Sequence, residues 1–326
     1  MIEQTKQNNL IKTLLYILTI ILVLAVLKLP SNIVHVLILV FFYAYVSTAW
    51  DILGGYAGQM SFGHSLFIGV GAYTSTLLLL RLGITPWIGL FVSGLIALVI
   101  GAFMGFLCFR SNITGFYFAL VTIVFVEISR YLSLGFEWTG AAKGLYIPYK
   151  GNNISNLQFD SKYMYFYVIF AMYIGILILY KAIMKSKSGF YFLAIRENEE
   201  AAESIGINTY KYKMLATIIS SFLVGVAGSF WAQYITFIDP YTMFDFMLSV
   251  QIIFFAVAGG RGTLFGPLVG AALFVPLSEG LRTMMGRIAG INILVYGIIL
   301  ILILRFMPDG IFVWVKDRLK NLSHGR

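Results

Sequence analysis

Side chains that could do chemistry are few in this 326-residue sequence, and they are widely separated. The histidines are His35, His64 and His324, and no Cys, Asp or Glu lies at metal-ligand spacing from His64. A metal site or a catalytic constellation of His, Asp and Glu is therefore not expected. The single cysteine, Cys108, has no thiol partner for an intrachain disulfide. We predict neither catalytic residues nor a metal centre.

A glycine-rich loop could bind nucleotide phosphates, and one candidate occurs at Val257 to Gly270, VAGGRGTLFGPLVG. This stretch lacks the Lys-Ser/Thr pair that completes a P-loop, and no soluble strand precedes it. No P-loop occurs elsewhere in the sequence. We therefore expect that this chain does not hydrolyse ATP, is not an enzyme and binds no cofactor itself.

Polar residues also lie within an apolar, glycine-rich stretch from Gly54 to Ala72, GGYAGQMSFGHSLFIGVGA. In hydrocarbon, polar side chains need partners and should face other helices or a wet cavity. Small residues let membrane helices pack closely. Helix packing and a role in a translocation path explain this composition equally well. The candidates for either role are Gly58, Gln59, Ser61, Gly63 and His64, together with Gly259, Gly260, Gly262 and Thr263 of the later glycine cluster.

The longest polar interruption between two apolar runs is Lys181 to Lys213, which contains six Lys or Arg and four Glu. Membrane-protein loops that are rich in Lys and Arg stay on the cytoplasmic side. We therefore expect residues 181–213 to form a cytoplasmic loop.

Within this loop, the run from Arg196 to Gly206 is predicted to form one short, capped helix. Its acidic residues fall in the first turn, where negative charge suits the helix dipole. Gly206 is expected to end the helix in a left-handed conformation. Ala201, Ala202 and Ile205 should share one face, because residues three or four apart stack along a helix. We interpret this face as a small apolar docking surface for a partner.

The composition sets the class of protein that must position these residues. Hydrophobic residues make up 60% of the chain, charged residues make up 11%, and the mean hydropathy is +0.88. Soluble proteins contain about 25% charged residues, so this is predicted to be a polytopic membrane protein. The net charge of +9 comes from basic residues that border apolar runs. This pattern indicates membrane topology and a lipid partner, not nucleic acid.

Apolar runs long enough to form membrane helices predict an all-α transmembrane bundle in one membrane domain, residues 1–326. The eighth and ninth runs are short and flank Gly259 to Gly262, so they could form a re-entrant or broken pair. Ten runs place both termini in the cytoplasm. They are Leu10–Leu29, Ile33–Trp50, Ser61–Leu80, Pro86–Phe109, Ile113–Ser129, Tyr163–Tyr180, Met214–Ile235, Phe246–Ala258, Leu264–Leu277 and Ile291–Phe306.

This topology places one long connection, Arg130 to Lys162, outside the cell. Loops of such length are usually functional or mobile.

Acidic residues near the membrane are predicted to lie at or near segment ends, whereas a proton- or sodium-coupled carrier more often has one in mid-helix. This argues weakly against ion-coupled transport. The residues concerned are Asp51, Glu127, Asp245 and Glu279.

Five ordered motifs between Trp50 and Gly310 resemble those of the permeases of branched-chain amino-acid ABC importers, specifically the LivM-type subunit. Ala141 and Arg261 depart from the usual glycine and leucine of that family. The motifs are Tyr56–His64 with Gly69–Tyr73, Thr139-Gly140 with Gly144-Leu145 and Ile147-Pro148, Ala194–Asn208, Gly259–Pro267, and Pro308-Asp309-Gly310.

The resemblance implies a permease that forms half of a translocation pore in the cell membrane of a prokaryote. It implies a homologous second permease subunit, two ATP-binding subunits that hold ATP and Mg, and an external solute-binding protein that delivers leucine, isoleucine or valine. Relatives that carry urea or short amides share much of the pattern, and an ion-coupled carrier remains a further alternative. The residues expected to couple to the ATPases are Arg196, Glu197, Glu200, Ala201, Ala202 and Gly206.

Overall fold

The structure is a computed structural model, and it describes residues 26–285, 291–307 and 309–324. Helices dominate, as the composition predicts. The two short strands are β1 (Leu145–Tyr146) and β2 (Phe237–Ile238). The α-helices are α2 (Ser31–Asp51), α3 (His64–Leu82), α4 (Pro86–Arg110), α5 (Gly115–Gly135), α6 (Lys162–Lys185), α7 (Lys187–Glu197), α8 (Glu199–Ser204), α9 (Thr209–Ile235), α10 (Pro240–Met243), α11 (Phe246–Gly260), α12 (Gly266–Met285), α13 (Ile291–Phe306) and α14 (Ile311–His324).

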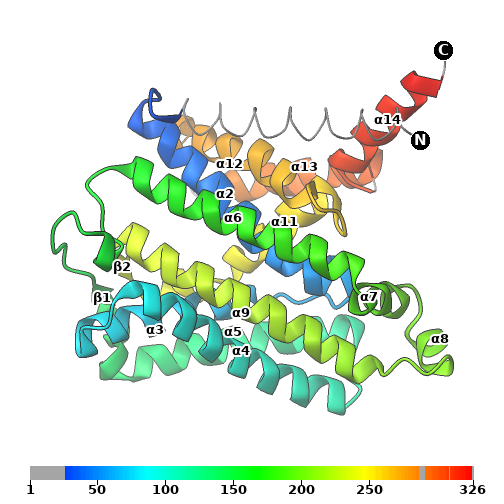
Figure 1. The fold of residues 1–326 in the computed structure, drawn as a ribbon, viewed down its shortest axis with the longest axis horizontal. Coiled ribbons are helices and arrows are strands. Elements are labelled where there is room, and N and C mark those ends of the chain that lie inside the picture. The colour runs from blue at the N-terminus through cyan, green and yellow to red at the C-terminus, as the bar shows by residue number, and fades with distance from the viewer. Residues whose placement is uncertain (1–25, 286–290, 308, 325–326) are drawn as a thin grey trace, which may run out of the picture.

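The connecting segments gather at two opposite ends of the bundle (Figure 1). At the left of the view, β1 pairs antiparallel with β2, and we call this the strand end. Two side-chain hydrogen bonds join other connections there, from Trp87 to the Ile154 carbonyl (2.7 Å) and from Tyr163 to the Leu29 carbonyl (2.8 Å). Helices α7 and α8 lie at the right, which we call the glycine end. The helices therefore run alternately from one end to the other.

The core is formed by α2, α3, α9 and α11, whose residues are largely buried. Helix α9 packs along both α3 and α4. By contrast, α4, α5 and α6 turn large apolar side chains outward, including Phe91, Phe116 and Ile178. A continuous apolar exterior is unfavourable in water but matches the hydrocarbon of a bilayer.

Seven helices in the described residues are long and apolar enough to cross a membrane. They confirm an all-α, multi-pass membrane protein. The predicted first run, Leu10–Leu29, lies mostly outside the described residues, so the number of ten helices stays a prediction. The position of both termini stays a prediction as well.

Several predicted boundaries are wrong. Helix α6 continues to Lys185 and α9 begins at Thr209, so both ends of the predicted loop 181–213 are helical, and α12 continues to Met285. The second run does not end at Trp50, because the chain continues as a π-helical turn, Ile52–Tyr56. Asp51 consequently lies inside this span and is fully buried. The long connection that is predicted to be external begins after Gly135 and not at Arg130. Arg130 forms an ion pair with Glu127 one turn earlier, which lets the helix continue past this charge.

The predicted eighth and ninth runs form two separate helices, α11 and α12, which pack side by side. The short turn between them contains Arg261 to Phe265. Thr263 stabilises this turn, since its hydroxyl donates to the Gly260 carbonyl (2.6 Å) and accepts from the Gly266 N–H (3.1 Å). With the preceding α10, α11 forms one of the seven candidate spans, Pro240–Gly260.

Candidate functional site

The two glycine-rich stretches meet at the glycine end, around the carboxylate of Asp51. The Gly262 N–H donates to both carboxylate oxygens, at 2.8 and 3.0 Å. The hydroxyl of Tyr180, on α6, donates to the same carboxylate at 2.6 Å. A buried carboxylate is costly unless hydrogen bonds compensate it. Asp51 therefore joins α2, α6 and the turn between α11 and α12 at one point.

Glycine is required here because the backbones approach too closely for a side chain. A Cβ atom at Gly55 would lie 1.8 Å from an Asp51 carboxylate oxygen and 2.8 Å from the Gly262 nitrogen. A Cβ at Gly259 would lie 1.8 Å from the Gly266 carbonyl oxygen, which is backbone and cannot rotate away. The same holds for Gly310, from the last sequence motif, where an added Cβ would lie 2.4 Å from the Gly260 Cα.

Arg196, at the end of α7, also belongs to this junction. Its Nη1 donates to the Gly55 carbonyl (3.0 Å), and its Nη2 donates to Glu197 (2.7 Å). A Cβ at Gly58 would lie 2.8 Å from the Arg196 Cγ, and Gly58 has a φ of +73°. The structure thus brings together Arg196, Gly58 and Gly262, which the sequence had placed in separate motifs.

Beside Arg196 lies a polar hollow of about 470 Å³. Its lining contains charges of both signs, with Arg196 and Arg261 facing Glu197 and Asp309. We define the glycine junction as Asp51, Gly55, Tyr180, Arg196 and Gly262. It connects the polar loop of residues 181–213 directly to two membrane-spanning elements.

The predicted single helix from Arg196 to Gly206 is wrong, because two helices occupy this run. Helix α7 ends at Glu197, and Asn198 caps α8 by accepting a hydrogen bond from the Ala201 N–H (2.9 Å). Asparagine is a preferred N-cap residue, so its position in the sequence could have revealed the break. The expected end is confirmed: Gly206 has a φ of +88°.

The predicted apolar face of α8 is wrong at one residue. Ala202 is buried, with 2% of its surface exposed, whereas Ile205 is 77% exposed. Ala201 is also exposed. Two contacts fix this rotation of α8 on α9: the ion pair of Lys213 with Glu199, and the hydrogen bond from Thr209 to Glu203 (2.5 Å). Ala202 packs within the chain and offers no surface to a partner.

The predicted docking surface would now consist of residues of the loop that are exposed in the structure. We define it as Phe190, Glu200, Ala201 and Ile205. Phe190 is 64% exposed. Large apolar side chains that project from a polar loop are typical of a protein contact surface.

The polar residues of the first glycine-rich stretch take part in helix packing. His64 Nε2 lies 2.8 Å from the Ser220 hydroxyl, which donates to the Ala49 carbonyl (2.7 Å). The carbonyl of Ser61 accepts from the indole of Trp50 (2.8 Å). A Cβ at Gly63 would lie 3.0 Å from Thr122 of α5. This geometry favours packing over a path lining for these residues.

Gln59 lies beside this packing but is only partly satisfied. Its Nε2 donates weakly to the Ala57 carbonyl (3.3 Å), and its buried Oε1 has no partner among the described residues.

The described residues contain no group of three or more His, Cys, Asp or Glu that could hold a metal ion.

Sequence reasoning did not select Asp51, Gly55 or Tyr180 as site residues. For Asp51 a signal was available, because it is a lone acid directly after a long apolar run. Gly55 was part of the glycine-rich stretch but was not singled out. Tyr180 carried no signal, since tyrosines are common in this chain.

Comparison with known proteins identifies the family. Residues 32–304 match the family described as "Branched-chain amino acid transport system / permease component", and the chain belongs to it. The LivM permease protein of the high-affinity branched-chain amino acid transport system of Escherichia coli is 28% identical over 310 residues, which cover 88% of this chain and 71% of that protein. This chain is therefore a transport subunit of the ABC permease type and not an enzyme.

Two further similarities complete the comparison. A probable branched-chain amino acid transport permease protein, LivH of Methanocaldococcus jannaschii, is 26% identical over 80% of this chain and 85% of its own length. A solved structure, described as PsaBC from Streptococcus pneumoniae in complex with Fab, covers 91% of this chain and 99% of its own. Its TM-score of 0.46 and identity of 18% are too low to support an argument.

Proposed function

We propose that this chain is one of two permease subunits in an ATP-driven importer of branched-chain amino acids in a prokaryotic cell membrane. The family assignment and the names of the LivM and LivH relatives support this substrate class. The partners would be a homologous second permease, two subunits that bind ATP and Mg, and an external solute-binding protein. Leucine, isoleucine or valine would cross between the two permeases.

The structural observation that carries this proposal is the hydrogen bond from Arg196 to the Gly55 carbonyl. Arg196 ends the helix next to the docking surface, and Gly55 lies in the π-helical turn of a membrane span. An ATPase that displaced the docking surface would therefore move this turn. Through Asp51 and Gly262, the displacement would reach α11 and α12 as well.

The proposed orientation places the glycine end in the cytoplasm and the strand end outside. Both termini would then be cytoplasmic. The Lys and Arg content of residues 181–213 supports this orientation. At the strand end, hydrogen bonds join several connecting segments to one another. The proposed topology places all of these segments on the same side of the membrane, the outside.

Uptake in reconstituted vesicles tests the function. Labelled leucine should accumulate only when both ATP-binding subunits, ATP and Mg are present. Excess isoleucine or valine should compete, whereas urea and short amides should not. Uptake that continues without the ATP-binding subunits would favour an ion-coupled carrier, and competition by urea alone would favour the urea and amide alternative.

The docking surface can be tested separately from the membrane fold. Ile205→Glu should reduce co-purification of the ATP-binding subunits, because it places a charge on an exposed apolar contact. The matched control is Ile154→Glu, since Ile154 is 72% exposed at the strand end. Equal loss in both variants, or in neither, would contradict the proposed docking surface.

Thiol labelling tests the orientation. In a Cys108→Ser background, a cysteine at Asn153 should react with an impermeant reagent added from outside. A cysteine at Asn208 should react only after the membrane has been opened. The reverse pattern would reject the cytoplasmic assignment of residues 181–213.

A further inference from the structure

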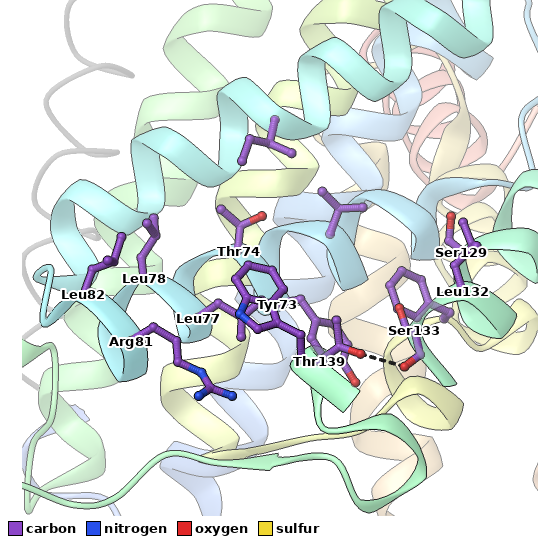
Figure 2. A pocket seen from close by; sticks show the side chains of 14 residues that line it. Tyr73, Thr74, Leu77, Leu78, Arg81, Leu82, Ser129, Leu132, Ser133 and Thr139 are labelled. Atoms are coloured by element: carbon purple, nitrogen blue, oxygen red, sulfur yellow. Dashed lines mark hydrogen bonds between the residues drawn. The ribbon is translucent and has the colours of Figure 1, made fainter. Parts of the chain in front are cut away.

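A cavity of about 560 Å³ opens near the strand end between α3 and α5. Figure 2 shows residues of α3, including Leu78 and Arg81, on one side and Leu132 and Ser133 of α5 on the other. The volume lies within the range of about 300–1,000 Å³ that is usual for small-molecule sites. Leu77 and Phe244 add to a mainly apolar wall. The cavity is thus large enough for a small organic molecule.

Among the described residues, Arg81 is the one charged residue that lines this cavity. No ion pair or hydrogen bond joins its guanidinium to another residue in the described ranges. An arginine presents a planar set of donors that matches a carboxylate in a bidentate manner. The cavity therefore offers a cation to an incoming anion, and its described lining contains no carboxylate that would compete for it.

Tyr73 contributes an additional unsatisfied polar group. It lines the same cavity, is 5% exposed, and its buried hydroxyl has no hydrogen-bond partner among the described residues. Buried polar atoms are normally paired, so an unpaired one needs an explanation such as a ligand or water. The hydroxyl-bearing residues Thr74 and Ser133 line the cavity too. The hydroxyl groups of Thr74 and Ser133 are thus available for a second part of a ligand, whereas the Tyr73 hydroxyl is itself buried.

The external connection closes one side of the cavity in a defined conformation. The Thr139 hydroxyl donates to the carbonyls of Ser133 and Phe136, both at 2.7 Å. The next residue, Gly140, has a φ of +83°, and a Cβ there would lie 2.4 Å from the Gly144 carbonyl oxygen. The Thr139-Gly140 motif therefore holds the chain against the end of α5, beside the cavity.

We propose that this cavity is a transient binding site for an aliphatic amino acid, with its carboxylate on Arg81 and its branched side chain against Leu77, Leu132 and Phe244. The choice of substrate class rests on the proposed function. The mixture of one cation, a few hydroxyl groups and an apolar wall matches the three parts of such a zwitterion. A lipid with an anionic headgroup is the competing occupant, because it also combines an anion with an apolar chain.

A photoreactive leucine that carries a diazirine in its side chain tests the site in the complete complex in lipid nanodiscs. After illumination, mass spectrometry should find the label in the peptides around residues 73–82 or 129–139. Excess leucine should suppress the label. Leucinol, which lacks the carboxylate, should compete about tenfold less well or worse, as expected for the loss of a charge-assisted hydrogen bond.

Variants identify the role of each part. Arg81→Gln should reduce labelling about tenfold, and Arg81→Lys should reduce it less because the charge remains. Leu132→Trp should reduce labelling by filling the cavity, and the exposure of Leu132, 53%, leaves room for the change. The matched control is Arg110→Gln, because Arg110 also ends a membrane helix but at the opposite end. Its labelling should equal that of the wild type.

Several outcomes would overturn the site. They are label found elsewhere, equal competition by leucine and leucinol, and unchanged labelling in Arg81→Gln. Competition by oleate but not by leucine would also overturn it, because it would indicate a lipid site. Leucine uptake by the wild-type complex is measured in parallel. Uptake without label in the cavity rejects this inference alone, whereas the absence of uptake rejects the proposed substrate and this site with it.

Discussion

The two ends of the bundle differ in whether their charged side chains have polar partners. At the glycine end, the buried carboxylate of Asp51 accepts hydrogen bonds from Tyr180 and Gly262, and Arg196 is bound to Gly55 and Glu197. At the strand end, Arg81 lines an open cavity without an ion pair among the described residues. Asp51 and Arg196 thus have polar partners at the glycine end, whereas Arg81 at the strand end has no ion pair among the described residues.

The two ends also differ in how closely their residues pack. At the glycine junction, the backbones of the π-helical turn after α2 and of the α11–α12 turn approach so closely that a single Cβ would collide. Such a contact transmits displacement, because packed groups cannot move independently. The cavity at the strand end has room for a small molecule instead. The contrast fits the proposed coupling connection at one end and the proposed binding space at the other.

The largest effect is expected from a side chain forced into the tight end. Gly259→Leu should destabilise the permease by at least about 3 kcal/mol, because the new side chain meets backbone that cannot move aside. The measurement is the yield of monodisperse complex and its thermal unfolding. Gly175→Leu is the control, since a Cβ there meets no described atom within 4 Å. Similar yields for both variants would show that Gly259 is packed no more tightly than Gly175.

A smaller loss of stability is expected when the central acceptor is removed. Asp51→Ala should cost roughly 2–3 kcal/mol, because it leaves the Gly262 N–H and the Tyr180 hydroxyl buried without their partner. Tyr180→Phe removes one hydrogen bond and should cost about 1 kcal/mol. Thermal unfolding of the purified complex measures both. If Tyr180→Phe were the more harmful change, Asp51 would not be the centre of the junction.

Arg196→Met is expected to affect coupling more than stability. It retains an aliphatic side chain beside Gly58 but removes the donor to the Gly55 carbonyl. Substrate-stimulated ATP hydrolysis should fall about tenfold, the equivalent of one charge-assisted hydrogen bond. Arg110→Met serves as the control, because Arg110 also ends a helix at this end of the bundle but is not bonded to Gly55. Normal stimulation in Arg196→Met would remove Arg196 from the coupling route.

The smallest change in stability is expected at the open end. Arg81→Gln should alter the free energy of unfolding by no more than about 0.5 kcal/mol, as is usual for exposed residues without a specific partner. Thermal unfolding of this variant beside Asp51→Ala compares the two ends directly. A loss as large as that of Asp51→Ala would show that Arg81 has a structural partner.

Several features of the fold were predictable because they depend on local composition or spacing. Apolar runs of about 20 residues predict membrane helices wherever they occur, and the described helices follow most of those runs. The left-handed Gly206 was predictable as well, since a glycine after a polar helical run is a common helix end. The helix break at Asn198 was missed although the residue type favours it.

Other features depend on which residues meet across long distances in the sequence. The hydrogen bond between Gly262 and Asp51 spans 211 positions, and that between Arg196 and Gly55 spans 141. No local pattern specifies such a pair. The burial of Ala202 likewise depends on how α8 is rotated against α9, which the ion pair of Lys213 with Glu199 determines.

The sequence by itself determined the class of protein, the family motifs and the position of the polar loop, because hydropathy and motif spacing are properties of short segments. Only the tertiary structure decided that the two glycine-rich stretches meet around one carboxylate, and that Arg81 lines a cavity with no ion-pair partner among the described residues. The physical reason is that a buried charge is compensated by whatever donors the packing brings to it. Those donors come from helices that are neighbours in space and not in sequence.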